Sequence, residues 1–160
     1  MSYTTIKYEK DGRIARVTFC RPEIHNAFNS TVITEMSEVF ARIALDKDIR
    51  VVVLTGEGKS FCAGADLNWM RSVINQSFEE NLAESNALAD LFHEIYTLER
   101  PVVGKINGAA IGGGTGFVAV CDIAIAARSA KFSFSEGKIG VVPACIGPYV
   151  IKKMGEGKAQ

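Results

Sequence analysis

The sequence Asn107-Gly108-Ala109-Ala110-Ile111-Gly112-Gly113-Gly114-Thr115-Gly116 places five glycines within nine residues. Each glycine loses extra backbone entropy on folding, so such a run is unfavourable in a regular element unless the backbone must approach another group closely or adopt a positive φ. An apolar, strand-like stretch precedes the run at 102–106, and a helix-compatible stretch follows it at 117–120. A strand, a glycine turn and a helix start leave backbone N–H groups free at a positive dipole end, where they can hold a phosphate or an oxyanion formed during a reaction. Close helix packing that leaves no room for a side chain would explain the glycines equally well.

Strands and helices alternate along the rest of the chain, which predicts an α/β fold with a largely parallel sheet. An Asp11-Gly12 turn between two alternating runs is typical of a β-hairpin. The run 51–55 is continuously apolar or β-branched, as expected for a strand that is buried on both faces. The expected strands are 3–10, 13–19, 51–55, 102–106, 122–126 (also buried) and 131–134.

Two long helices are indicated by apolar residues at helical spacing. The first covers 30–45 and can be capped by Asn29 or Ser30. The second begins at a capping-box pattern, Ser77 to Glu80, and is stopped by Pro101. The region 68–76 is polar and irregular, and another helix starts near Tyr149. The apolar side of the second long helix is expected to contain Phe78, Leu82, Leu88, Ala89, Phe92, Ile95 and Tyr96.

The bulk properties indicate one domain over residues 1–160. The formal net charge is zero, which gives no reason to expect a nucleic acid or an anionic membrane as partner. The four cysteines are widely separated, so neither a disulfide framework nor a metal site is expected, and reduced thiols indicate a cytoplasmic protein. The start lacks the pattern of a secretion signal, and the end, Lys158 to Gln160, shows no helix stop and is interpreted as cut.

Three nucleotide-binding or hydrolytic motifs are absent. A phosphate-binding P-loop that ends at Gly58-Lys59-Ser60 would need glycine at 53, where the chain has Val53. A dinucleotide fingerprint in the glycine run would need glycine at 117 or 119, which are Phe117 and Ala119. No G-x-S-x-G sequence occurs, so a serine hydrolase would lack its nucleophile.

Acid/base chemistry is therefore expected from carboxylates. Glu136 lies on a loop with apolar neighbours, where it could act as a general acid or base or simply face solvent. Asp122 opens a strand, where capping or pairing is the expected role, and Asp66 follows a glycine-containing loop. A nucleophilic pair of Cys62 with His25 is a further hypothesis, against the alternative that Cys62 is a small packed residue.

Four segments in this order resemble the enoyl-CoA hydratase/isomerase (crotonase) family. They are Ser60-Phe61-Cys62-Ala63-Gly64-Ala65-Asp66-Leu67, Asn107–Gly114, Cys121–Ala126, and Phe134-Ser135-Glu136 continuing through Gly140-Val141-Val142-Pro143. Arg21-Pro22 with Asn26-Ala27 is similar to an early motif of the family on the coenzyme A side. The resemblance extends over the whole chain, and some stretches are similar to bacterial methylglutaconyl-CoA hydratases of leucine breakdown.

The resemblance implies a crotonase-like spiral of ββα units whose C-terminal helical part is missing from this chain. It implies an acyl-CoA thioester as ligand, coenzyme A as part of the substrate rather than a separate cofactor, and assembly as a homotrimer or hexamer. By matching position, the backbone N–H groups of Ala65 and Gly113 would form an oxyanion hole and Glu136 would be the acid/base. The residues that would meet coenzyme A are Ile24, His25, Ala63, Asp66, Leu67 and Asn68.

One position departs from the family pattern of hydratases. These enzymes use two glutamates, the second of which matches Glu136, whereas the first falls at Gly116, which has no side chain. The expected activity is hydration of a 2-enoyl-CoA. The alternatives are an isomerase that moves a double bond with one glutamate, and an acyl-CoA binder without catalysis.

Overall fold

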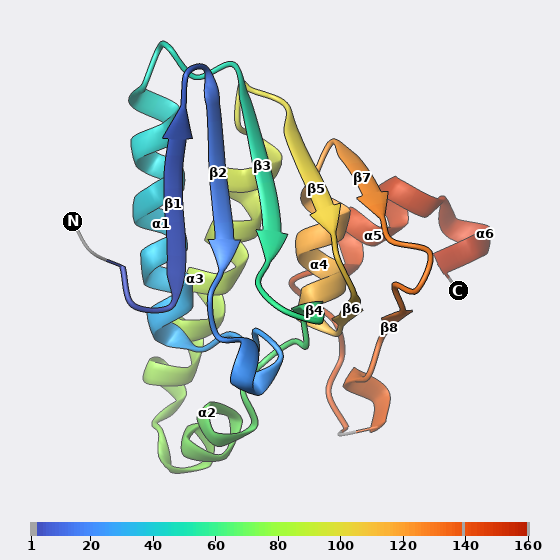
Figure 1. Cartoon of the computed structure of the whole chain (residues 1–160). Helices are drawn as coiled ribbons and strands as arrows, with labels where there is room; N and C mark the ends of the chain where they lie inside the picture. The colour runs from blue at the N-terminus through green and yellow to red at the C-terminus, as the bar shows by residue number, and fades with distance from the viewer. Residues whose placement is uncertain (1–2, 139, 160) are drawn as a thin grey trace.

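The computed structural model describes residues 3–138 and 140–159 and consists of two sheets with helices packed on one side (Figure 1). The larger sheet has the order β1-β2-β3-β5-β7, and the smaller one has the order β4-β6-β8. β1 and β2 form the expected antiparallel hairpin, and every other pairing in both sheets is parallel. The strands are β1 (Ile6–Asp11), β2 (Ile14–Phe19), β3 (Val51–Gly56), β4 (Ser60–Cys62), β5 (Val102–Ile106), β6 (Ala109–Ile111), β7 (Ile123–Ala126) and β8 (Phe132–Ser133).

In each successive pair of strands from β3 onward, the first strand joins the larger sheet and the second joins the smaller sheet, and this repeat produces the spiral. β3, β5 and β7 enter the larger sheet, and β4, β6 and β8 follow them directly into the smaller sheet before the chain turns into a helix. The α helices are α1 (Ser30–Leu45), α2 (Leu67–Ser72), α3 (Phe78–Tyr96), α4 (Gly113–Val120), α5 (Gly147–Met154) and α6 (Glu156–Ala159). The short 3-10 helices are η1 (Pro22–Ile24), η2 (Val73–Asn75) and η3 (Glu136–Lys138).

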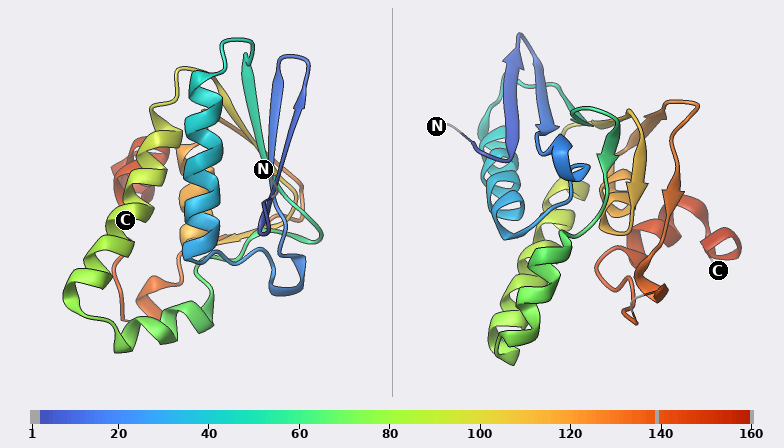
Figure 2. Two further views of the ribbon diagram at one scale, coloured as in Figure 1. Left: turned by 90° about the vertical axis from the view of Figure 1, so that its left-hand side faces the viewer. Right: turned by 60° about the horizontal axis from the view of Figure 1, so that its bottom comes forward.

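The core lies between the larger sheet and the helices (Figure 2). The ring of Phe117 on α4 is fully buried and is the centre of an aromatic cluster. Its centroid lies 5.1 Å from that of Phe19, 5.8 Å from that of Phe28 and 4.8 Å from that of Phe92. Because these rings come from β2, α3, α4 and the loop before α1, one cluster joins the layers.

Most expected elements are confirmed, and α1 has the expected bounds, with Asn29 accepting a hydrogen bond from the Val32 N–H at 3.1 Å. The capping box of α3 is also present. The prediction missed β4 and β6, because strands of three residues are too short to show an alternating pattern. The irregular region after residue 66 contains α2 and η2. The ends of the expected domain 1–160 lie outside the described residues.

Three burial expectations were wrong. In β3 only Val52 and Leu54 are fully buried, since the described helices cover one face of the sheet. β7 was expected to be buried but is exposed along its length, because it is the edge strand of the larger sheet in the described chain. Phe78 and Leu82 are exposed, because the N-terminal half of α3 extends past the N-terminal end of α1 (Figure 2). Tyr96, the last residue of α3, is exposed as well.

None of the helices in the described part of the chain combines the length and the apolar character needed to cross a bilayer.

Replacing Asn29 by Ala should lower the free energy of unfolding by about 1 kcal/mol, because the first turn of α1 loses its side-chain acceptor. Urea denaturation of the parent and the variant measures this difference. Glu38→Ala, an exposed change in the middle of the same helix, is the matched control and should have a much smaller effect. Equal losses in both variants would contradict the capping role.

Candidate active site

A cavity of about 890 Å³ lies beyond the carboxyl ends of the parallel strands, where ligands bind in open α/β sheets. In Figure 1 the arrowheads of β2, β3 and β5 point toward this end of the molecule. Its walls come from η1, the segment 63–68, the C-terminal part of α2, two residues of α3, the start of α4, and the segments 135–136 and 141–146. Segments far apart in the sequence therefore meet at one site.

Two backbone N–H groups on the wall of this cavity are free of hydrogen bonds to the described residues. They belong to Ala65, which follows β4, and to Gly113, the first residue of α4. The two loops approach each other closely, since a Cβ added to Gly64 would lie 3.7 Å from the nitrogen of Gly113. Free donors of this kind can stabilise a negative charge on a carbonyl oxygen.

The loop that carries Ala65 is held by its neighbours. The Phe28 N–H donates to the carbonyl of Gly64 at 2.8 Å, and the Asp66 N–H donates to the carbonyl of Phe28 at 2.8 Å. These two bonds flank Ala65 and fix its orientation without using its own N–H. Gly64 has φ of +92°, and a Cβ there would lie 2.8 Å from the carbonyl oxygen of Ile111, so glycine is required on both counts.

Glu136 extends its carboxylate over the beginning of α4. A Cβ added to Gly112 would lie 3.1 Å from Oε1 of Glu136. The other oxygen, Oε2, is buried and has no hydrogen-bond partner among the described residues. A buried carboxylate oxygen without a partner is costly, and such groups are found at catalytic sites. Gly112 directly precedes Gly113 in sequence, and Glu136 and Gly113 line the same cavity.

Asp66 is engaged in structure rather than free for proton transfer. Its Oδ2 lies 3.0 Å from Nη2 of Arg21, and its Oδ1 accepts from the Asn68 N–H at 2.9 Å, which caps α2. Arg21 also donates to the carbonyl of Ala27 at 2.6 Å. Burial raises the pKa of the Asp66 carboxyl, but the bonds from Asn68 and Arg21 outweigh it, and the net pKa is below the ordinary value of 3.8.

His25 and Cys62 do not form a nucleophilic pair. The imidazole Nδ1 of His25 lies 3.1 Å from Oγ of Ser60, and its backbone carbonyl accepts from the Ala63 N–H at 3.0 Å. Cys62 is fully buried, and this burial raises the pKa of its thiol to about 12. The thiol is therefore protonated at neutral pH and serves as a packed core residue.

Gly116, the position of the missing glutamate, faces packed side chains rather than open space. A Cβ there would overlap Cγ2 of Ile146 and would lie 3.0 Å from Cζ of Phe92. Ile146 is 3% exposed and lines the cavity. A larger residue at 116 would require Ile146 to move.

All of the site residues expected from the sequence line this one cavity, and their roles stay predictions. They are Ile24, His25, Ala63, Ala65, Asp66, Leu67, Asn68, Gly113 and Glu136. Sequence reasoning missed Phe28 and Ile146 as parts of the site. Neither residue belongs to a polar or glycine-rich motif. Their place in the site is seen only in the structure, from their contacts with Gly113 and Gly116. Asp122 pairs as expected, since its Oδ2 accepts from the Val102 N–H at 2.7 Å.

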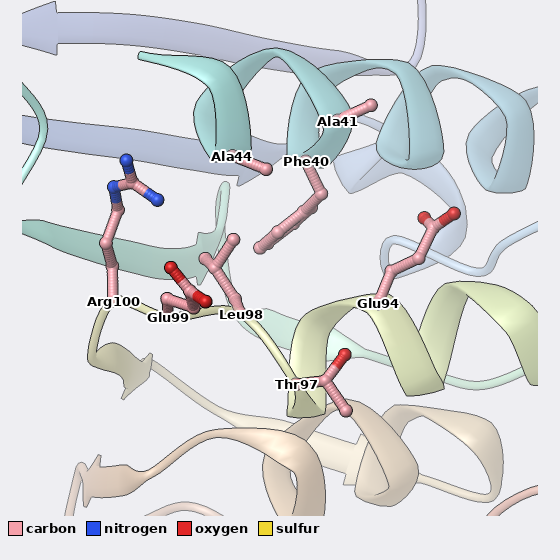
Figure 3. A pocket seen from close by; sticks show the side chains of 8 residues that line it. All are labelled: Phe40, Ala41, Ala44, Glu94, Thr97, Leu98, Glu99 and Arg100. Atoms are coloured by element: carbon pink, nitrogen blue, oxygen red, sulfur yellow. The ribbon is translucent and has the colours of Figure 1, made fainter. Parts of the chain in front are cut away.

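A second cavity, of about 320 Å³, lies between α1 and the segment after α3 (Figure 3). Phe40 and Leu98 point toward each other across it, and the Arg100 side chain donates to the carbonyls of Ile49 and Asp46 at 3.1 Å. The guanidinium of Arg100 therefore joins the segment after α3 to the loop between α1 and β3. None of the residues expected to act in catalysis lines this cavity.

The Asp66 carboxylate should make stability depend on pH. Because its pKa is lower in the folded state, its contribution is present above the unfolded pKa of about 3.9 and is lost as pH falls through the folded value. The difference in unfolding free energy between the parent and Asp66→Asn should therefore shrink as pH falls from about 6 to about 3. Chemical denaturation at several pH values checks this, with Asp90→Asn, an exposed carboxylate of α3, as control. A pH-independent difference would contradict the assignment.

The sequence matches the enoyl-CoA hydratase/isomerase family over residues 9–160. A short-chain-enoyl-CoA hydratase of Clostridium acetobutylicum is 38% identical over 148 residues, covering 89% of this chain and 54% of that protein. The crystal structure of an enoyl-CoA hydratase from Shewanella pealeana superimposes with a TM-score of 0.95 at 38% identity, over 98% of this chain and 59% of that one. An enoyl-CoA hydratase/isomerase from Marinobacter aquaeolei gives a TM-score of 0.90 at 33% identity, over 97% and 61%.

The chain thus spans little more than half of the length of the relatives that it matches. The match with the family includes every residue that lines the large cavity, from Ile24 to Ile146. The chain belongs to the enoyl-CoA hydratase/isomerase family.

Proposed function

We propose that this protein binds an acyl-CoA thioester and adds water to a 2-enoyl-CoA. One observation carries the proposal: the Oε2 of Glu136 and the N–H groups of Ala65 and Gly113, none of which has a hydrogen-bond partner among the described residues, share one cavity. The two donors would bind the thioester oxygen, and the carboxylate would move protons at the neighbouring carbon atoms. The name of the Clostridium acetobutylicum relative, a short-chain-enoyl-CoA hydratase, supports this reaction.

The chemistry requires a place for negative charge. In hydration, the oxygen of water forms a bond to the β-carbon, and the electrons of the double bond move onto the thioester as an enolate. Ala65 and Gly113 would stabilise the enolate oxygen, and loss of one such donor typically costs about 3–4 kcal/mol of barrier. Glu136 would take a proton from the water and deliver a proton to the α-carbon, so the carboxylate ends in its starting state.

The coenzyme A portion is proposed to lie along the wall formed by η1 and the segment 63–68. Within the wall, Ile24, His25 and Leu67 offer apolar surface or backbone groups. Asp66 would act indirectly, because its carboxylate is paired with Arg21 and caps α2. Coenzyme A enters as part of the substrate, and the proposed reaction needs no separate cofactor.

Two finer proposals rest on the sequence resemblance alone. One is a branched enoyl-CoA of leucine breakdown as substrate. The other is assembly of the whole protein into a homotrimer or hexamer.

Glu136→Gln should lower kcat for crotonyl-CoA hydration by about 10²- to 10⁴-fold, because the amide cannot exchange the proton. KM should change little, since the amide keeps the size of the side chain. Loss of absorbance of the conjugated thioester measures the rate. Glu94→Gln, on the wall of the smaller cavity, is the matched control and should retain parent activity. Hydration by Glu136→Gln at the parent rate would contradict the assignment of Glu136 as the acid/base.

A parent protein that binds acyl-CoA tightly but turns over none of a broad panel would instead be a binder without catalysis.

Isomerisation of a double bond is the second candidate, and the packing at Gly116 favours it. Ile146 occupies the space of a side chain at 116, so this position contributes no carboxylate. Among the described residues on the cavity wall, Glu136 is the one carboxylate without an ion-pair partner, since Asp66 pairs with Arg21. One carboxylate suffices to take a proton from C2 and return it to C4. Incubation with a 3-enoyl-CoA decides the question: an isomerase would form the conjugated 2-enoyl thioester, whereas a hydratase without this activity would leave the substrate unchanged.

A further inference from the structure

Ile146 is a rigid part of the cavity wall. It lies at the N-terminus of α5, where its carbonyl accepts from the N–H groups of Tyr149 and Val150, each at 3.1 Å. Its own N–H donates to the carbonyl of Pro143 at 3.3 Å. With its backbone fixed on both sides and its side chain 3% exposed, it has little freedom to move away from a ligand.

The side chain of Ile146 is supported from behind by groups that are themselves fixed. Cγ2 occupies the place of a side chain on Gly116, and the Phe92 ring borders the same place. Phe92 in turn packs on Phe117, with ring centroids 4.8 Å apart, and on Tyr149, with ring centroids 6.4 Å apart. Removal of Ile146 atoms would therefore extend the cavity toward Gly116 and Phe92 rather than let the wall collapse.

The position of Ile146 relative to Glu136 follows from the geometry of α4. The Glu136 carboxylate lies over Gly112, and Gly116 follows one helical turn later, with its N–H donating to the carbonyl of Gly112 at 3.3 Å. One turn advances about 5.4 Å along the axis. An extended alkyl chain spans that distance with roughly four C–C bonds of about 1.5 Å each.

We propose that Ile146 is a specificity-determining residue that limits the acyl group to a short chain. The proposal rests on the proposed function, because the acyl chain is taken to start where Ala65 and Gly113 hold the thioester oxygen. From there it passes Glu136 and meets Ile146 after a few carbons. Ile146 touches the distal acyl atoms and takes no part in proton transfer.

The test measures binding of saturated acyl-CoAs, which can be neither hydrated nor isomerised. Titration calorimetry gives the Kd of butyryl-CoA and decanoyl-CoA for the parent, Ile146→Val, Ile146→Ala and Val150→Ala. Val150 is a buried residue of the same helix that does not line the cavity, so Val150→Ala is the matched control. The parent should bind butyryl-CoA more tightly than decanoyl-CoA.

Ile146→Ala should shift the ratio of the two Kd values toward decanoyl-CoA by about tenfold or more, since each methylene in an apolar pocket changes discrimination by about 10- to 200-fold. Ile146→Val should shift it in the same direction by less, and it carries the test if the alanine variant fails to fold. Adding Gly116→Ala to Ile146→Ala should reverse part of the shift, because the new methyl refills the opened space. Val150→Ala should leave the ratio at the parent value.

An unchanged ratio in both Ile146 variants, or an equal shift in Val150→Ala, would overturn the role of Ile146 and leave the proposed function intact. Absence of binding for every acyl-CoA would overturn the proposed function, and this proposal with it. Reduced hydration by Glu136→Gln together with the expected Kd ratios would support both.

Discussion

The structure depends on how closely the backbone of the glycine run approaches its neighbours. A Cβ on Gly113 would lie 2.6 Å from the Phe28 ring, and one on Gly114 would overlap the carbonyl oxygen of Cys62. α4 can therefore begin directly against β4 and the loop before α1 only if its first turn has no side chains there. The same absence brings the N–H of Gly113 beside the Gly64-Ala65 loop. Close packing and the proposed charge-stabilising role are thus not alternatives at this run, since the packing also places the N–H groups that the proposal uses.

The elements with long, regular patterns could be predicted from the sequence. α1 repeats its apolar spacing over four turns and has a side-chain cap, so local preference and tertiary packing agree on its bounds. β4 and β6 could not be predicted, because strands of three residues are defined by their pairing partners. The exposure of β7 and of the start of α3 depends on which elements lie above them, which the chain's own spacing does not encode.

The residues of the candidate site also fall into those that could be predicted from the sequence and those that could not. Ala65, Gly113 and Glu136 lie in stretches with unusual composition or a family-like pattern, so their meeting at one cavity was expected from the sequence. Ile146 is an ordinary aliphatic residue, and nothing local distinguishes it from the isoleucines of the core. Its proposed role follows from its contact with Gly116, thirty positions earlier, where its Cγ2 occupies the place of a side chain. A contact between distant residues of this kind requires the three-dimensional structure.

The segment 67–90, which lines one side of the cavity, contributes few buried side chains to the core. α2 and η2 bury no residue, and the buried residues of α3 are confined to its C-terminal half, at Leu91, Phe92 and Ile95. Regions with little buried apolar surface open at a lower free energy than the whole domain. Amide hydrogens of residues 67–90 are therefore expected to exchange through local opening, and those of β3 and β5 through global unfolding. A ligand that touches Met70, Ser85 and Leu88 ties this wall to the core, so binding is coupled to the order of the segment itself.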